Sequence, residues 1–508
     1  MFRLIRTGAP WLTLSFASQV IRGAVVMSIV VLDHCNIRRK GASMRWTWKP
    51  VLSSPEGAKY RAIADAIAAA INSGELRPGE RLPPQRDLSF RMEVSVQTVF
   101  QAYAELERRG LVSGEVGRGT YVRYANLDKV PGSIVDKREE DFLDFSTIAP
   151  IVGEAHVQAL RDMLAVLSKS RGLEPLLSNR PIVGLHHHRS LGADWLKALG
   201  LKASSETILI TNGCQHGLWV ALASLTEPGD VVASDHLVDS SVITSSTILK
   251  LQLRGLASDS SGVLPDAFAA LCSRERVKVL CLTPTLNNPT ASFMDEVRRR
   301  AIAEIARKFN VWIIEDDVFG PLVEKGPPPI AAFAPERTCY ATSFSKSVMH
   351  SLRTGYLLVP EDLVSRAVSR LRTTGWMSNS FGAEISCRWL SDGTTAELIA
   401  WQRQKLGQRH KILERALKDF QKNTNSTSLH VWLSLPGLWR TGPFIEEARR
   451  RGVLITGPDP FIVGREADPH AVRLTIGDSV REDDDFKRGI ETLAQLLSSD
   501  AGSCLPHI

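Results

Sequence analysis

The 508-residue sequence predicts an α/β protein in which a small helical domain precedes a larger domain with a mostly parallel sheet and helices on both faces. Two observations lead to this prediction. Between Tyr60 and Val122, three helical segments precede two short strands. From about residue 141 onward, short apolar runs alternate with amphipathic helical segments, which is typical of parallel strands joined by helices.

The formal net charge of +7 is concentrated near the N-terminus. Residues 1–43 carry six Lys or Arg and one Asp, and residues 44–124 carry twelve basic and nine acidic residues. This distribution favours a polyanion as the partner of the N-terminal part. The seven cysteines are scattered without a zinc-ligand spacing, which is typical of a reducing compartment, so we expect a cytoplasmic protein.

Residues 11–32 are mostly apolar, but Arg22 divides them into two pieces, each shorter than the ~20 residues that span a bilayer. A membrane anchor and a signal segment are the alternatives, although no convincing cleavage site follows. We expect instead that residues 1–43 are a non-native extension and that the chain begins at Met44, with no membrane partner.

Apolar residues at helical spacing indicate the first helix: Tyr60, Ile63, Ile67 and Ile71. It ends at Asn72-Ser73-Gly74, and a loop rich in Pro and Gly separates it from a short helix over residues 85–91.

The third helix is predicted to begin after the N-cap Ser95 and to run to Arg109, where Gly110 stops it. Its expected apolar face consists of Val96, Val99, Tyr103 and Leu106. Two strands, 111–113 and 120–122, surround Gly117-Arg118-Gly119 and complete a winged helix-turn-helix within residues 44–124.

The start of the third helix of such a domain meets base edges in the major groove, and small polar groups there meet phosphates. Ser95, Gln97 and Thr98 lie at this start, while Arg86 and the wing residues Arg118 and Gly119 are placed to add contacts to double-stranded DNA. The alternative is an accessory domain without a role in DNA binding.

Residues 58–124 resemble the GntR-type DNA-binding domain in "GELRPGERLPPQRDLS" and "ERRGLVSGEVGRGTYV". The family often has an arginine where this chain has Val96. The polar residues 125–140, which include Pro131-Gly132, are predicted to form a linker.

In the larger domain, Lys346 lies among hydroxyl residues and is followed seven positions later by Arg353. This arrangement suits pyridoxal 5'-phosphate (PLP). The amine can form a Schiff base with the aldehyde, while Ser343, Ser345 and Arg353 can hold the phosphate. The alternative is a surface loop with an ordinary lysine.

Polar residues also follow other strands of the predicted sheet, at the edge where ligands of such sheets bind. Cys214 and Gln215 open a helix whose N–H groups can bind a phosphate. Asn288 can donate to the phenolic oxygen of PLP, and Asp316 can pair with the pyridine nitrogen. The alternatives are a tight turn, a polar turn and a helix cap.

Arg473 lies in an apolar strand, where a buried arginine needs a partner. A substrate carboxylate is one candidate, and an internal salt bridge is the alternative. The run His186-His187-His188 is not expected to bind metal, because adjacent residues cannot easily all face one ion and no acidic or Cys cluster lies nearby in the sequence.

The order of these motifs across residues 141–499 resembles the fold-type I aminotransferases, and residues 44–499 resemble a MocR-type regulator of the GntR family. The resemblance implies that Lys346 is the Schiff-base lysine and that Asp316 and Asn288 contact the PLP ring. It also implies phosphate contacts from Cys214, Gln215, Ser343, Ser345 and Arg353, an effector carboxylate on Arg473, a small subdomain over about residues 376–499 and a tail at 500–508.

Three tyrosines common in the family are replaced here, by Asp239, Phe319 and Asn179. The loss of a hydrogen bond at Phe319 amounts to about 1 kcal/mol. These changes predict weaker cofactor affinity or an unusual effector.

The favoured hypothesis is a homodimeric transcription regulator whose aminotransferase-like domain senses PLP or an amino compound. The alternatives are an active aminotransferase with an accessory DNA-binding domain, and a regulator that has lost PLP.

Overall fold

The computed structural model of the protein describes residues 59–72, 75–76, 80–109, 111–115, 119–122, 142–178, 181–437, 439–464, 468–477 and 483–499. The predicted extension at 1–43, Met44, Arg118, the linker at 125–140, Asn179 and the tail at 500–508 lie outside these residues.

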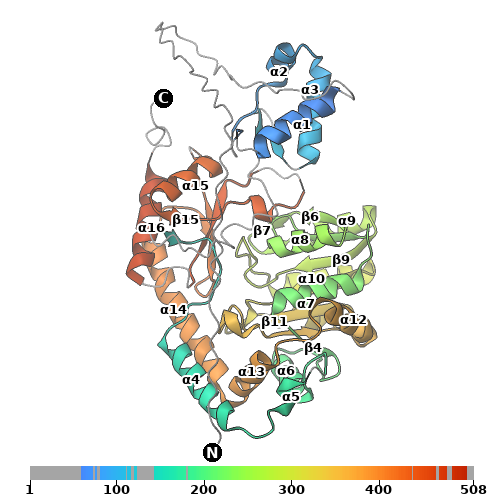
Figure 1. The fold of residues 1–508 in the computed structure, drawn as a ribbon, viewed down its shortest axis with the longest axis vertical. Coiled ribbons are helices and arrows are strands. Elements are labelled where there is room, and N and C mark those ends of the chain that lie inside the picture. The colour runs from blue at the N-terminus through green and yellow to red at the C-terminus, as the bar shows by residue number, and fades with distance from the viewer. Residues whose placement is uncertain are drawn as a thin grey trace, which may run out of the picture. The chain divides into compact units, whose positions relative to one another are not determined.

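The N-terminal domain consists of three helices followed by a two-stranded antiparallel wing, as the sequence predicts. These elements are α1 (Lys59–Asn72), α2 (Gln85–Met92), α3 (Val96–Arg108), β1 (Val112–Glu115) and β2 (Gly119–Val122) (Figure 1). Ile63 and Ile67 of α1 are buried together with Leu88 of α2 and Val99 and Leu106 of α3, so each helix contributes to one small core.

The start of α3 has the predicted cap, but the predicted apolar face is wrong at one position. Ser95 Oγ accepts a hydrogen bond from the Thr98 N–H at 3.1 Å. Val96 is 45 % exposed, as is Phe100 at 51 %, because these two residues share a side of the helix at i, i+4 that lies beside the buried stripe of Val99. The first turns of α3 therefore present an apolar as well as a polar surface.

The larger domain is organised around a seven-stranded sheet with the order β4-β12-β11-β10-β9-β5-β6 (Figure 1). Its strands are β4 (Ile208–Thr211), β5 (Val231–Asp235), β6 (Gln252–Leu256), β9 (Val277–Leu282), β10 (Trp312–Asp316), β11 (Thr338–Ser343) and β12 (Gly355–Leu358). β12 pairs antiparallel with both β11 and β4, whereas the other pairs of this sheet are parallel, so the prediction of a mostly parallel sheet is confirmed.

Helices cover both faces of this sheet. Neighbouring residues in a strand point to opposite faces, so one strand packs against helices on both sides. Ile314 of β10 belongs to the apolar cluster that contains Val220 of α7 (Cys214–Leu225). Ile313 instead belongs to the cluster that contains Ile302 of α10 (Glu296–Lys308). The strands are thus buried on both sides, which explains why they are continuous apolar runs in the sequence.

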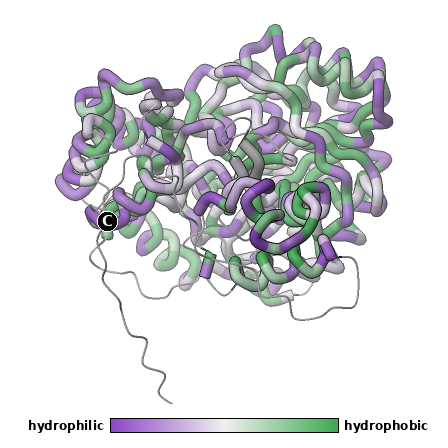
Figure 2. The backbone as a smooth tube through the Cα atoms, turned by 90° about the horizontal axis from the view of Figure 1, so that it is seen from above, coloured by the Kyte–Doolittle hydropathy of each residue, from purple (hydrophilic) through white to green (hydrophobic). Residues whose placement is uncertain are grey.

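The C-terminal part contains a three-stranded antiparallel sheet, β13 (Lys422–Asn423), β14 (His430–Ser434) and β16 (Ala471–Thr475). Three helices accompany it: α14 (Thr394–Ala416), α15 (Thr441–Arg450) and α16 (Asp483–Ser498). Hydrophilic and hydrophobic residues alternate along the outer helices, as expected where one side of a helix is buried (Figure 2).

The other helices of the larger domain complete its periphery. They are α4 (Glu154–Lys169), α5 (Glu174–Leu177), α6 (His186–Ala198), α8 (Ser240–Ile248), α9 (Pro265–Arg274), α11 (Ile330–Phe333), α12 (Val364–Gly375) and α13 (Ser380–Asp392). In the part of the chain that the structure describes, no helix has both the length and the apolar character needed to cross a bilayer.

Candidate cofactor site and DNA-binding surface

A cleft of about 540 Å³ lies at the carboxyl ends of the central strands. Every residue that the sequence analysis proposed for a cofactor or effector lines it: Cys214, Gln215, Asn288, Asp316, Ser343, Ser345, Lys346, Arg353 and Arg473. The fold brings these residues together because most of them follow, end or lie within a strand, while Arg353 lies just before the antiparallel strand β12. The cleft is therefore the candidate site for PLP.

Lys346 follows β11 and extends into the cleft. Its Nζ donates a hydrogen bond to the Ile148 carbonyl oxygen at 2.6 Å. The loss of surrounding water lowers the pKa of this amine to about 8, with a smaller lowering by Arg473 and an opposing effect of Asp239. The amine is thus neutral in an appreciable fraction of molecules near neutral pH, and the neutral form is the nucleophile.

Asp316, the last residue of β10, faces the start of α7. Its Oδ1 accepts hydrogen bonds from the Val318 N–H at 3.1 Å and from Cys214 Sγ at 3.2 Å. Burial raises the pKa of this carboxyl group to about 7, despite both hydrogen bonds. A positive charge next to Asp316 would offset this penalty, which is what a protonated pyridine nitrogen supplies.

The turn before α7 contacts the guanidinium of Arg353. Gly213 has φ +84°, a backbone conformation that favours glycine, and a Cβ added there would lie 2.8 Å from Arg353 Nη2. Arg353 Nη2 donates to the Asn212 carbonyl oxygen at 2.8 Å. The buried Ser345 Oγ has no hydrogen-bond partner among the described residues. These donors, together with the N-terminus of α7, fit a phosphate.

Arg473 of β16 reaches the cleft from the C-terminal sheet. Its Nη1 donates to Asn288 Oδ1 at 2.8 Å, and its Nη2 donates to the Ser146 carbonyl oxygen and to Thr456 Oγ1. Asn288 Nδ2 in turn donates to Asp239 Oδ2 at 2.6 Å. Burial lowers the pKa of Arg473 to about 10, so the guanidinium stays charged at neutral pH.

Asp239 and Phe319, two of the three residues that stand where the family often has tyrosine, are among the described residues, and both line the cleft. Asp239 caps α8, since its Oδ1 accepts from the Ser241 N–H at 2.9 Å. Phe319 is 3 % exposed, and its ring centre lies 5.4 Å from that of His430. A carboxylate and a phenyl ring thus stand on the cleft wall.

Sequence reasoning missed some residues of the cleft. The carbonyl groups of Ile148 and Ser146 hold Lys346 and Arg473, yet a main-chain acceptor gives no signal in the residue types. Thr456 and Phe461 also line the cleft, and they lie in a segment for which the sequence contained no motif.

The proposed DNA-contacting residues lie on neighbouring elements of the N-terminal domain. Arg86 is exposed on the first turn of α2, Ser95 and Gln97 are exposed at the start of α3, and Thr98 is half-buried. Gly119 opens β2 with φ +120°, a backbone conformation that favours glycine. The structure does not describe Arg118, so its position stays a prediction from the sequence.

Comparison with known proteins agrees with the division of the chain into an N-terminal DNA-binding domain and a larger aminotransferase-like domain. Residues 164–491 match the family described as aminotransferase class I and II, and residues 59–122 match the gntR family of bacterial regulatory proteins. The chain is 29 % identical over 455 residues to YdeF of Bacillus subtilis, an uncharacterized HTH-type transcriptional regulator, covering 89 % of this chain and 97 % of the relative.

Aminotransferases without the N-terminal domain are also similar. The mitochondrial kynurenine/alpha-aminoadipate aminotransferase of Mus musculus is 26 % identical over 315 residues, which cover 57 % of this chain and 73 % of that protein. Among solved structures, Pyrococcus horikoshii kynurenine aminotransferase has a TM-score of 0.65 at 22 % identity, covering 76 % of this chain and 98 % of that one.

The alpha-aminoadipate aminotransferase LysN from Thermus thermophilus has a TM-score of 0.64 at 19 % identity, covering 70 % of this chain and 92 % of that chain. These structural similarities establish the fold-type I aminotransferase fold. The chain therefore belongs to the aminotransferase class I and II family and carries a gntR-family DNA-binding domain at its N-terminus, the arrangement of MocR-like transcriptional regulators.

Proposed function

We propose that this protein is a PLP-dependent transcription regulator whose aminotransferase-like domain senses PLP or an amino compound and thereby changes DNA binding. The observation that carries the proposal is the meeting of Lys346, Asp316 and Arg353 in one cleft, on a chain that also has a gntR-family domain. The amine, the carboxylate and the guanidinium match the aldehyde, the ring nitrogen and the phosphate of PLP.

The described residues fit the cofactor at each of its polar groups. Arg353, the hydroxyl of Ser345, which has no hydrogen-bond partner among the described residues, and the N-terminus of α7 would hold the phosphate. Asp316 would hold the ring nitrogen, and the amide of Asn288 would reach the phenolic oxygen. When bound, PLP supplies an aldehyde that reacts with amines and a ring that withdraws electrons.

Without a bound cofactor, the Lys346 amine already has a lowered pKa and a fixed orientation, as a reactive amine needs. Its lowered pKa raises the neutral fraction at physiological pH, and the hydrogen bond to the Ile148 carbonyl fixes the direction of Nζ. Desolvation therefore activates the amine, while the carbonyl orients it.

An effector with a carboxylate would meet Arg473. In the present structure the guanidinium is engaged by Asn288 and by the Ser146 carbonyl, and its Nε has no hydrogen-bond partner among the described residues. A bound carboxylate would satisfy this buried donor or exchange with Asn288. Such an exchange is a means by which an amino compound can alter contacts between the C-terminal sheet and the large sheet.

Sensing is favoured over catalytic turnover by two residues of the cleft wall. The resemblance to the family places Asp239 where a stacking tyrosine is common, and Phe319 provides no phenolic hydroxyl; both residues line the cleft. Both substitutions remove contacts that hold the cofactor ring. A cofactor held less firmly suits a sensor whose occupancy follows the available PLP.

A true aminotransferase is the second candidate function, because Lys346 and Asp316 line the same cleft. Incubation with kynurenine or α-aminoadipate, the amino acids in the names of related enzymes, together with a keto acid separates the two. Repeated turnover supports the enzyme, whereas PLP-dependent DNA binding without turnover supports the regulator.

We also infer a cytoplasmic homodimer that binds an operator with two-fold symmetry. DNA regulators of this type bind half-sites whose spacing mirrors the symmetry of the protein. Light scattering of the free chain and its DNA complex, with footprinting of a bound fragment, tests this point. A monomer that protects a single half-site would contradict it.

A further inference from the structure

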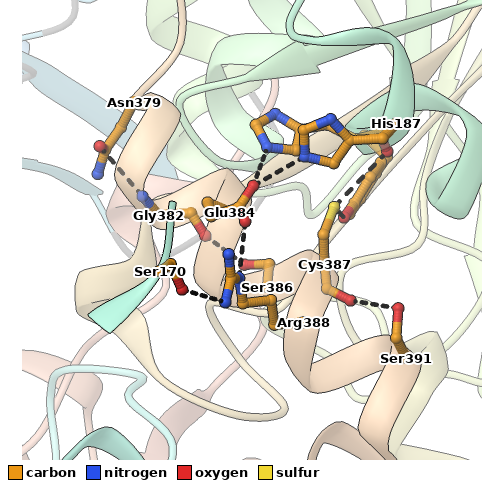
Figure 3. A network of polar contacts seen from close by, with 11 residues as sticks. Ser170, His187, Asn379, Gly382, Glu384, Ser386, Cys387, Arg388 and Ser391 are labelled. Atoms are coloured by element: carbon orange, nitrogen blue, oxygen red, sulfur yellow. Dashed lines mark hydrogen bonds and ion pairs between the residues drawn. The ribbon is translucent and has the colours of Figure 1, made fainter. Parts of the chain in front are cut away.

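Helix α6 begins with three consecutive histidines, and two of them meet a glutamate from a distant part of the chain (Figure 3). His187 Nε2 lies 2.8 Å from Glu384 Oε2, and His188 Nε2 lies 3.0 Å from the same oxygen. Glu384 belongs to α13, 196 residues after His188. We refer to these three residues as the α6–α13 cluster.

We propose that the α6–α13 cluster is a binding site for a divalent transition-metal ion of the zinc class, with His187, His188 and Glu384 as its ligands. Two imidazoles and one carboxylate are a ligand set that zinc accepts, with a water molecule in the fourth position. The site is separate from the PLP cleft, whose lining includes none of the three residues.

The spacing of the ligand atoms suits such an ion. All three atoms lie within 4.8 Å of one another. Zinc–ligand bonds of about 2.0–2.1 Å in a tetrahedron place neighbouring ligand atoms about 3.3 Å apart. The nitrogen–oxygen separations of 2.8 and 3.0 Å therefore need to open by only a few tenths of an ångström. Hydrogen bonds hold both imidazole nitrogens near the carboxylate oxygen without the ion.

The second oxygen of Glu384 is oriented by a neighbouring residue. Arg388 Nε donates to Glu384 Oε1 at 2.7 Å, and Arg388 Nη1 donates to Ser170 Oγ at 3.1 Å (Figure 3). This pairing fixes the carboxylate with Oε2 facing the two imidazoles. Hydrogen-bonded support of this kind is typical of carboxylates that bind metal.

Two ligands of the site are buried, and the third is exposed to solvent. The side chains of His188 and Glu384 are 1 % and 10 % exposed, whereas that of His187 is 53 % exposed. An ion can therefore enter from the side of His187 and keep a water ligand there. The two buried ligands are held by packed helices.

Sequence reasoning excluded metal because it considered only neighbouring residues. Adjacent side chains on a helix diverge by about 100°. Here Glu384 Oε2 lies within reach of both imidazoles, and the two ring centres are only 4.2 Å apart. The third ligand arises from tertiary packing of α13 on α6, which no local spacing reveals.

The test uses the full, untagged chain after chelator treatment and desalting, titrated with zinc chloride by calorimetry. His187→Ala should weaken the tightest zinc binding by at least about tenfold. Loss of a residue that only hydrogen-bonds to a metal ligand already costs about tenfold or more in metal affinity, and loss of a ligand itself should cost more. His186→Ala is the matched control, because it removes an adjacent exposed histidine outside the cluster. Zinc bound elsewhere on the chain would be bound equally by both variants.

Two further measurements exclude a folding artefact. Zinc should raise the melting temperature of the wild type and of His186→Ala but not that of His187→Ala, because an ion bound only by the folded state stabilises it. Cobalt(II) should give the strong visible absorption of a four-coordinate site, absent in His187→Ala and in Glu384→Gln. Equal zinc affinity and equal melting shifts in the two histidine variants would overturn the proposal.

Discussion

Arg473 Nη1 donates a hydrogen bond to Asn288 Oδ1 at 2.8 Å, across 185 residues of sequence. This contact links β16 of the C-terminal sheet to the segment that follows β9 of the large sheet. Asn288 then donates to Asp239, which caps α8. A ligand that competes for Arg473 would therefore act on β16, on the segment after β9 and on α8. This linkage is the basis for proposing an effector at this position.

The first prediction concerns Arg473. Arg473→Met should reduce the apparent affinity for an amino-acid effector by about 10- to 150-fold, because a charge-assisted pair contributes about 1.5–3 kcal/mol. PLP binding should remain, since its proposed phosphate donors are untouched. Amino-acid titrations followed by the absorption of bound PLP measure both effects, with Arg372→Met on the surface of α12 as control. Equal amino-acid affinities in the two variants would remove Arg473 from the effector site.

The second prediction concerns the pH dependence of the cofactor-free chain. Burial raises the pKa of Asp316 from 3.8 to about 7, so the folded state binds more protons than the unfolded state between these values. Stability from this group therefore falls as the pH rises through that window, by up to about 4 kcal/mol. Asp316→Asn should melt at a higher temperature than the wild type at pH 8, with the difference shrinking towards pH 4.

Melting curves from pH 4 to pH 8, recorded for both proteins without PLP, check this prediction. A constant difference across the range would mean that Asp316 is not the titrating group. Addition of PLP at pH 8 should stabilise the wild type more than the variant, because the asparagine cannot pair with a charged ring nitrogen.

The sequence predicted the parts of the site that follow strands. Lys346 and Asp316 were recognisable because apolar runs locate strand ends, and ligands of such sheets bind there. Arg353 was recognisable by its spacing of seven positions from Lys346. Val96 was predicted on the apolar face of the third helix but is exposed, because periodicity alone cannot separate the edge of an apolar stripe from its centre. Glu384 and the Ile148 carbonyl were missed because their roles depend on distant packing.

The third prediction tests the replaced tyrosine at Phe319. Phe319→Tyr should raise PLP affinity by up to about fivefold, the equivalent of one hydrogen bond of about 1 kcal/mol. Phe309→Tyr, in the turn after α10, is a control that adds a hydroxyl away from the cleft. Titration with PLP, followed by absorption, measures the affinities. Unchanged affinity in Phe319→Tyr would show that this position does not limit cofactor binding.

The fourth prediction concerns DNA. Arg86→Ala and Arg118→Ala should each weaken operator binding and lower the slope of log affinity against log salt by about 1, as expected for one lost phosphate contact. Lys202→Ala, an exposed lysine of the larger domain, removes the same charge and should leave the slope unchanged. If an arginine variant matches Lys202→Ala, that arginine does not contact the duplex.

Control of DNA binding by PLP on Lys346 can be decided by one paired titration. Operator affinity is measured with and without PLP for the wild type and Lys346→Ala, with visible spectra of the same samples. We expect a PLP-dependent change of affinity and an absorption band in the wild type. In the variant we expect loss of the band and of most of the response, with basal DNA binding retained. A wild type without the band, or a variant that responds to PLP as fully as the wild type, would contradict control through Lys346.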